Sequence, residues 1–322
     1  MGLIVDGQWI NEWYDTESNK GEFQRQASRF RHKITSQGSF KAEADRYHLY
    51  VSLACPWAHR ALIFRELKQL QNIISVSIVR PEMREHGWEF DNQNPEFGDH
   101  LFNSNYMYQL YLKAAPDYQG RVTVPVLWDK KTHQIVNNES SEIIRIFNTA
   151  FNDITGNTDD YYPEVLREEI DEINERIYHQ INNGVYRAGF ATTQTAYEQA
   201  YDELFSSLDW LEARLSKQRY LVGDKLTEAD WRLFTTLLRF DAVYHGHFKC
   251  NRNKLSEFHH LSNYVRELYQ FGSIADTIDL PYTKTHYYAS HDTINPTLIV
   301  PKGPEVNFML AHNRELIANQ GS

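Results

Sequence analysis

Cysteine is scarce in this sequence. Only two of the 322 residues are cysteines, Cys55 and Cys250. Two distant cysteines cannot build the framework of bridges that holds small secreted domains together, so a disulfide-stapled fold is excluded and no pairing of these two is expected. The composition suits a reducing compartment, and we expect a cytoplasmic protein.

Long apolar runs and excess positive charge are also missing. No stretch is long and apolar enough to span a bilayer, and the N-terminal segment MGLIVDGQWINEWYD lacks the basic start and apolar core of a secretory signal. The 33 Lys and Arg are outnumbered by 43 Asp and Glu, giving a net charge of −10. This balance argues against nucleic acid or an anionic membrane as a partner.

Aromatic residues, in contrast, are plentiful. They make up 14% of the chain, with 20 Tyr and 7 Trp. Most suit an aromatic core, and the alternative for some of them is the lining of a pocket for a flat or phenolic ligand.

The chain divides into an irregular arm and two segments with different patterns. Residues 1–45 are polar and predict an arm over the core. Residues 46–152 predict strand, helix, strand, a long insert at 81–121, then two strands and a helix, which is the order of an α/β thioredoxin-like domain. Residues 163–322 predict an all-α domain whose proline-rich tail, from about residue 280, is mostly irregular.

The segment LACPWAHR places Cys55 between a predicted strand and a predicted helix. A cysteine at a helix N-terminus meets unpaired N–H groups and the positive end of the helix dipole, which lower its pKa and make it a nucleophile. Pro56 suits the first helical turn, and Arg60 adds positive charge one turn later. Ala58 stands where a dithiol enzyme keeps its second cysteine, so a thiol from solution must resolve a mixed disulfide. The abundant cytosolic thiol is glutathione.

Two further segments fit a glutathione site. In RVTVPVLW, Pro125 stands at a strand entry, where such a proline is often cis and leaves the backbone of Val124 able to pair with a peptide ligand. In NNESSEII, Glu139 and Ser140 open a helix, whose N–H groups can bind the γ-glutamyl carboxylate while Glu139 holds the ammonium.

Five segments together resemble the glutathionyl-hydroquinone reductases, the xi class of glutathione transferases: LACPWAHR, TVPVLWD, NNESSEIIRIFN, NNGVYRAGFA and HYYASHDTINPTLIVPKGP. The resemblance spans nearly the whole chain. It implies the glutathione transferase fold, a homodimer, and reduction of aromatic glutathionyl-hydroquinones by glutathione, with release of glutathione disulfide.

The resemblance also implies roles for individual residues. Cys55 would be the nucleophile and Tyr186 the proton donor, with Tyr244 and Tyr287 near the sulfur and the substrate; the sequence leaves open whether Tyr287 or Tyr288 faces the site. The glutathione contacts would be Trp88, Arg121, Val122, Val124, Pro125, Glu139 and Ser140. Tyrosine suits proton donation to a hydroquinone, since its hydroxyl has an ordinary pKa of about 10.

The sequence is also compatible with two other functions. One is a different cysteine-dependent enzyme of the omega type, such as a dehydroascorbate reductase or a general deglutathionylase. Another is a non-catalytic binding protein on the same fold. The pairs His286 and His291, and His259 and His260, lack partners at zinc-like spacing, so we expect no metal site.

Overall fold

The computed structural model describes residues 2–317. The chain folds into two compact units. The first holds Gln26–Asp159 and Pro281–Val300, together with the N-terminal residues up to Trp13. The second holds Asp160–Leu280, together with Tyr14–Arg25 and the residues after Val300. The predicted arm is therefore shared between the units, and residues 281–300 group with the first unit.

A four-stranded sheet forms the centre of the first unit, in the order β4-β3-β6-β7. Its strands are β3 (Tyr47–Val51), β4 (Ile74–Ile78), β6 (Val126–Asp129) and β7 (Gln134–Asn137). β3 and β4 are parallel, whereas β6 is antiparallel to both β3 and β7. All five residues of β3 are buried, as the apolar and aromatic sequence of a central strand requires. This sheet confirms the predicted thioredoxin-like domain.

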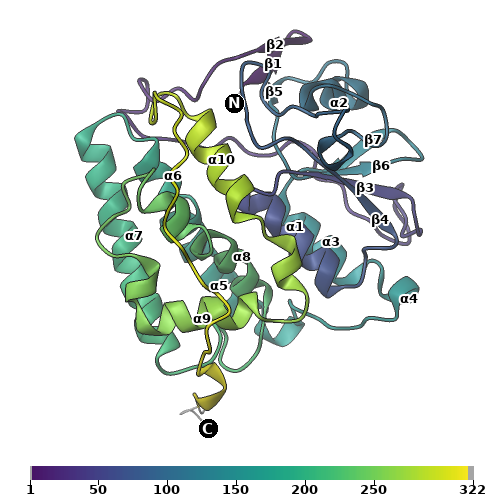
Figure 1. Cartoon of the computed structure of the whole chain (residues 1–322). Coiled ribbons are helices and arrows are strands. Elements are labelled where there is room, and N and C mark those ends of the chain that lie inside the picture. The colour runs from purple at the N-terminus through teal and green to yellow at the C-terminus, as the bar shows by residue number, and fades with distance from the viewer. Residues whose placement is uncertain (1, 318–322) are drawn as a thin grey trace. The chain divides into compact units, whose positions relative to one another are not determined.

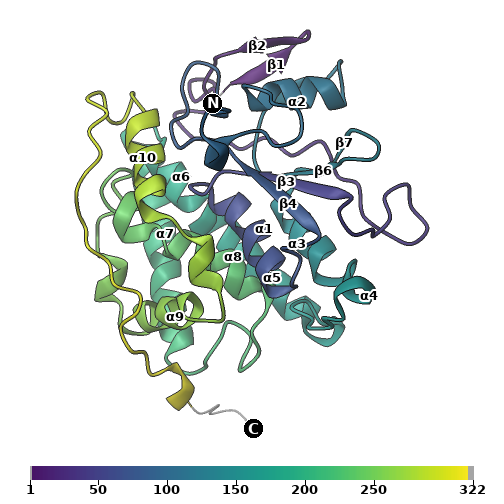
Figure 2. The same cartoon turned by 45° about the vertical axis from the view of Figure 1, so that its right-hand side comes forward.

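Helices cover both faces of this sheet (Figures 1 and 2). α1 (Pro56–Leu67) and α3 (Ser140–Thr149) pack together on one face, and α2 (Met107–Ala114) lies on the other. The unit also contains α4 (Asn152–Thr155) and a small sheet of β1 (Leu3–Val5), β2 (Gln8–Ile10) and β5 (Gly120–Arg121). The predicted insert at 81–121 thus contributes α2 and an edge strand.

Residues 280–290 form helix α10 (Leu280–Ser290), so the expectation of an irregular tail from about residue 280 is wrong for this segment. The buried side chains of α10 are Tyr282, Thr283, His286 and Tyr287. A helix that buries tyrosine, threonine and histidine shows no aliphatic stripe, and that stripe is the signal by which helices are recognised in a sequence.

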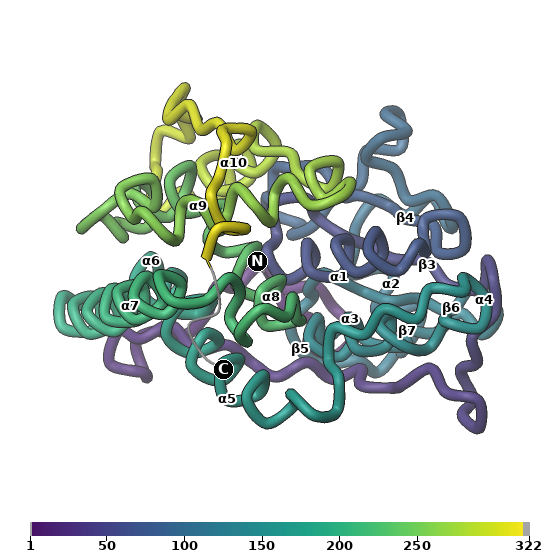
Figure 3. Tube along the Cα trace, turned by 90° about the horizontal axis from the view of Figure 1, so that it is seen from below, coloured from purple at the N-terminus to yellow at the C-terminus, as the bar shows by residue number. Residues whose placement is uncertain are grey.

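The second unit is helical (Figure 3). Its α-helices are α5 (Arg167–Ile177), α6 (Gly184–Gly189), α7 (Gln194–Leu215), α8 (Glu228–Leu237) and α9 (His259–Tyr269). π-helical turns span Tyr178–Asn182 and Phe240–Tyr244. Short 3-10 turns in the two units span Pro95–Phe97, Glu164–Leu166, Leu255–Glu257, Ile274–Thr277 and Arg314–Leu316. No helix within residues 2–317 has both the length and the apolar character needed to cross a membrane.

The start of α8 is fixed by a helix cap. Thr227 and Asp230 form a capping box, in which the Asp230 carboxylate accepts the Thr227 N–H at 2.8 Å. The same carboxylate accepts the Leu221 N–H and the Tyr264 hydroxyl, each at 2.8 Å. A fully buried carboxylate with these donors joins the start of α8 to α9 and to the preceding loop.

Buried His48 makes the stability of the fold sensitive to acid. The ring lies in β3 with no exposed surface, its Nδ1 is 2.7 Å from Ser75 Oγ, and burial lowers its pKa to about 3. In the unfolded chain the His48 imidazole has the ordinary histidine pKa of about 6.5. The contribution of neutral His48 to the free energy of unfolding is therefore complete above about pH 6.5. It is lost progressively as the pH falls toward 3.

We expect the free energy of unfolding to fall by about 2 kcal/mol through this residue between pH 7 and pH 5. Urea titrations at the two pH values measure the loss. His48→Gln should remove most of the difference, whereas His32→Gln, at an exposed position, should keep it. Equal acid sensitivity of the wild type and His48→Gln would contradict the assignment.

Candidate active site

Cys55 is the N-cap of α1, as predicted. Its backbone is extended (φ −75°, ψ 116°), and Pro56 occupies the first helical turn. The Ala58 N–H points at the sulfur, with Ala58 N 3.5 Å from Cys55 Sγ. No acidic residue stands in this first turn. The sulfur is therefore held against a helix N-terminus, where backbone N–H groups and the helix dipole favour a thiolate.

Val124 and Pro125 lie beside this sulfur. The Val124–Pro125 peptide bond is cis, which confirms the prediction made from its place at a strand entry. The Val124 carbonyl oxygen lies 3.5 Å from Cys55 Sγ, so the thiol can donate to it. The loop before β6 thus brings main-chain groups to the sulfur, where a peptide-like thiol substrate would need them.

Glu139 and Ser140 lie at the N-terminus of α3, again as predicted. Glu139 is the N-cap, and its carboxylate accepts the Ser141 N–H at 3.1 Å, the Ser141 hydroxyl at 2.9 Å and the Ser28 hydroxyl at 3.1 Å. An ionised carboxylate has about four acceptor positions, so these contacts leave capacity for a ligand ammonium. Ser140 is buried, and its hydroxyl lies 3.5 Å from Arg60 Nη1.

Arg60 connects the two helix starts. It is almost fully buried in α1, and its guanidinium lies 4.6 Å from the Trp57 ring centroid and within reach of Ser140 at the start of α3. The positive charge predicted near Cys55 is therefore also a packing element that fixes α3 against α1.

Trp88, Arg121 and Val122 are buried in the first unit. The Trp88 ring stacks on His286 of α10, with centroids 4.9 Å apart. The Arg121 guanidinium donates to the carbonyl oxygens of Glu12 and Trp13, the latter at 2.7 Å. These contacts give the residues structural roles, and their predicted contacts with glutathione stay predictions.

α10 contributes residues beside the Cys55 loop that the sequence did not indicate. The Tyr282 hydroxyl donates to the Val79 carbonyl at 2.6 Å and lies 3.3 Å from Ser52 Oγ. Thr283 Oγ1 lies 3.4 Å from the Leu53 carbonyl oxygen. Burial raises the pKa of Tyr282, which keeps the hydroxyl protonated as a donor. These contacts of α10 thus hold the segment just before Cys55, at Ser52 and Leu53, in place.

Tyr287 is the more buried of the adjacent tyrosines in α10. It is 2% exposed, whereas Tyr288 is partly exposed. Its ring contacts His286 and His291 at centroid distances of 5.2 and 5.7 Å. Tyr287 therefore belongs to an aromatic cluster on the same helix as Tyr282.

Tyr186 and Tyr244 lie together in the second unit, with ring centroids 6.1 Å apart. Phe248 contacts both rings at 5.5 Å. The guanidinium carbon of Arg25 lies 5.1 Å from the Tyr186 ring centroid, and Arg25 Nε donates to Asn183 Oδ1 at 3.0 Å. The π face of an aromatic ring attracts a cation held over it, so this contact helps to fix Arg25 against Tyr186.

Cys250 lies in the interior of the second unit. It has no exposed surface, forms no disulfide with Cys55, and burial raises its pKa. Within residues 2–317 there is also no group of three or more His, Cys, Asp or Glu side chains placed to hold a metal ion.

The residues that sequence reasoning missed come mainly from the arm and α10. Ser28 reaches Glu139, and Phe30 exchanges hydrogen bonds with Asn138. Arg25 reaches Tyr186 within the second unit. None of these arm residues stands in a periodic or capping pattern, so nothing in the local sequence distinguishes them from solvent-facing polar residues.

Comparison with known proteins places these features in a family. The Glutathione S-transferase N-terminal domain pattern matches residues 54–150, and the C-terminal domain pattern matches residues 194–267. The chain is 53% identical to glutathionyl-hydroquinone reductase YqjG of Escherichia coli, over 98% of this chain and 99% of that protein. It is also 53% identical to glutathionyl-hydroquinone reductase PcpF of Sphingobium chlorophenolicum, over 94% and 96% of the two chains.

Solved structures show the same similarity. A glutathione-bound structure of YqjG superposes with a TM-score of 0.87, covering 89% of this chain and 96% of that chain. The xi-class glutathione transferase of Natrialba magadii, 48% identical, superposes with a TM-score of 0.93 and covers 98% of both chains.

Proposed function

Because this chain belongs to the glutathione transferase family and to its xi class, we propose that it is a glutathionyl-hydroquinone reductase that uses glutathione as its co-substrate. The observation that carries the proposal is Cys55 at the N-terminus of α1 with Ala58 in place of a second thiol. Such a site can accept a glutathionyl group, and it needs a thiol from solution to release it.

In the first step the Cys55 thiolate attacks the sulfur that joins glutathione to the aromatic ring of the substrate. An S–S bond forms between Cys55 and glutathione while the aryl C–S bond breaks. The electron pair of that bond goes to the ring carbon, which must take up a proton to leave as hydroquinone. We assign this proton to the hydroxyl of Tyr186, which the nearby Arg25 guanidinium helps to release.

In the second step a second glutathione, as its thiolate, attacks the glutathionyl sulfur of the mixed disulfide. Glutathione disulfide leaves, and Cys55 returns to the thiolate at the start of α1. The ring has gained hydrogen in place of sulfur, and two glutathione molecules have supplied the two electrons by forming the disulfide.

The geometry of the first unit supports the glutathione contacts that we propose. The main chain of Val124 at the cis Pro125 bond would pair with the cysteinyl part of glutathione. The start of α3 at Ser140 would hold the γ-glutamyl carboxylate, and Glu139 the ammonium. Tyr244 and Tyr287 would contact the substrate ring.

We also propose that the protein is a homodimer in the cytoplasm. The resemblance to xi-class enzymes supports the dimer. The proposed reaction consumes reduced glutathione, which is abundant in the cytosol, and this supports the location.

A substrate comparison tests the proposed function. With glutathione present, the protein should release hydroquinone from a glutathionyl-hydroquinone rapidly and should reduce dehydroascorbate poorly. Separation of the products by chromatography measures both reactions. Good activity on dehydroascorbate with none on the conjugate would favour an omega-type reductase. Inactivity on both substrates and on glutathionylated peptides would favour a binding protein.

A further inference from the structure

The two π-helical turns found within residues 2–317 both adjoin tyrosines of the second unit. The first, Tyr178–Asn182, ends four residues before Tyr186, and the second, Phe240–Tyr244, ends on Tyr244 itself. Each turn is closed by a backbone N–H that bonds at 2.9 Å to the carbonyl five residues back, where an α-helix would bond four back. Single π turns inside helices often occur at functional sites.

The first π turn changes the direction in which Tyr186 points. Each residue of an α-helix advances the side-chain direction by about 100°. In an unbroken α-helix Tyr186, nine residues after the buried Ile177, would point about half a turn away from the face that Ile177 marks. The π turn accommodates one extra residue, so it rotates the following chain back by about 100° and leaves Tyr186 on the buried side.

Asn182 ties this first turn to α8. It is 2% exposed, and its side-chain amide donates to the Arg232 carbonyl oxygen at 3.1 Å and to Thr236 Oγ1 at 2.7 Å. An amide nitrogen carries two N–H groups, so both donors of Asn182 are used on α8. On another side, the Ser207 hydroxyl of α7 donates to Gln180 Oε1. The turn is thus held by two neighbouring helices.

Asn183, the next residue, links the same turn to the cation beside Tyr186. Its Oδ1 accepts the Arg25 Nε–H at 3.0 Å, and the guanidinium carbon of Arg25 lies 5.1 Å from the Tyr186 ring centroid. A change in the π turn would therefore displace the tyrosine ring and the support of its cation together.

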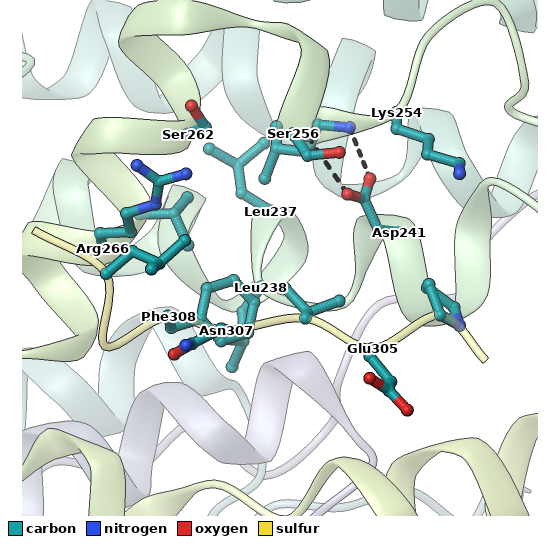
Figure 4. Close-up of a pocket in the computed structure, with 15 residues that line it drawn as sticks. Leu237, Leu238, Asp241, Lys254, Ser256, Ser262, Arg266, Glu305, Asn307 and Phe308 are labelled. Atoms are coloured by element: carbon teal, nitrogen blue, oxygen red, sulfur yellow. Dashed lines mark hydrogen bonds between the residues drawn. The ribbon is translucent and has the colours of Figure 1, made fainter. Parts of the chain in front are cut away.

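The second π turn is tied in a similar way, by Asp241. Its carboxylate accepts the backbone N–H groups of Leu255 and Ser256, the latter at 3.2 Å (Figure 4). Tyr244, at the end of this turn, has its ring centroid 6.1 Å from that of Tyr186. One polar side chain in each π turn therefore fixes the backbone from which one of the two rings projects.

We propose that Asn182 is the positioning residue for the proton donor Tyr186. By holding the π turn on α8, it keeps α6 in the rotation that presents the Tyr186 hydroxyl to the substrate. The inference rests on the proposed function, because it needs Tyr186 to give up a proton. Asn182 does no chemistry itself, so its replacement acts through the geometry of Tyr186, and a misplacement of about 1 Å is enough to slow a positioned reaction.

Asn182→Leu tests the proposal, because it removes both amide donors and keeps the branched shape of the side chain. It should slow hydroquinone release about tenfold or more. The reaction of Cys55 with glutathione disulfide needs no proton from Tyr186 and should stay within about twofold of the wild-type rate. In Tyr186→Phe the same replacement should cause no further loss, because the hydroxyl that it positions is absent. A further loss in that background would reveal a general structural defect and overturn the proposal.

Asn174→Leu is the matched control. Asn174 is also a buried asparagine that donates to α8, to Glu228 Oε1 at 3.0 Å, but it precedes the π turn. Its replacement should leave hydroquinone release within about twofold of the wild-type rate, and slowing equal to that of Asn182→Leu would contradict the proposal. Thr236→Val removes one of the two acceptors of Asn182 and should slow release about threefold, which keeps the test available if Asn182→Leu does not fold.

Hydrogen exchange gives a readout that does not depend on activity. The Asn183 N–H closes the π turn and should exchange about tenfold faster in Asn182→Leu, whereas the amides of α9 should be unchanged. Unchanged exchange at Asn183, or faster exchange with unchanged hydroquinone release, would overturn the proposal. A wild-type protein that releases no hydroquinone would instead refute the proposed function, and exchange at Asn183 would still decide whether Asn182 holds the turn.

Discussion

Replacing Cys55 by alanine is expected to lower the rate of hydroquinone release by at least about a thousandfold, because the step that breaks the aryl C–S bond loses its nucleophile. Substrate binding should change much less, since glutathione would still meet Val124 and the start of α3. The loss should therefore appear in kcat rather than in KM. Stopped assays with a glutathionyl-hydroquinone and excess glutathione measure both constants.

Cys250→Ala is the matched control for this experiment. Cys250 is fully buried and burial raises its pKa, so its removal should leave turnover nearly unchanged. Mass spectrometry of the wild type after exposure to glutathione disulfide should find one glutathionyl group, on Cys55. Turnover by Cys55→Ala close to that of the wild type, or a glutathionyl group on Cys250, would refute the assignment of Cys55 as nucleophile.

Replacing Tyr186 by phenylalanine is expected to slow hydroquinone release by about a hundredfold or more, the usual size of a lost general acid. The change removes one hydroxyl and keeps the ring that packs on Tyr244 and Phe248. The reaction of Cys55 with glutathione disulfide needs no carbon protonation, so it should proceed at the wild-type rate. A single-turnover assay of each half-reaction separates the two effects.

Two further variants test whether the effect is specific to the Tyr186 hydroxyl. Tyr201→Phe removes a hydroxyl from a partly exposed tyrosine of α7 and should change neither half-reaction. Arg25→Gln removes the cation near the Tyr186 ring and should slow the same step as Tyr186→Phe, by a smaller factor. Unchanged hydroquinone release in Tyr186→Phe would mean that this tyrosine only packs.

The local sequence was enough to locate the parts of the site that sit at ends of secondary structure. Cys-Pro after a central strand places Cys55 as the N-cap of α1, and Glu139 before a helical pattern is the N-cap of α3. The cap formed by Thr227 and Asp230 is of the same short-range kind. These features rest on bonds between residues two or three positions apart, so a short window contains all the atoms that decide them.

The chain by itself therefore determined the thioredoxin-like and helical folds, and the position of Cys55 at the start of α1 with no second thiol three residues later. Only the tertiary structure decided that residues 280–290 are a helix that braces Ser52 and Leu53, and that Trp88 stacks on His286. It also decided that Arg25 lies over Tyr186. The physical reason is that these contacts join residues far apart along the chain, and their stabilising bonds exist only after the chain has folded.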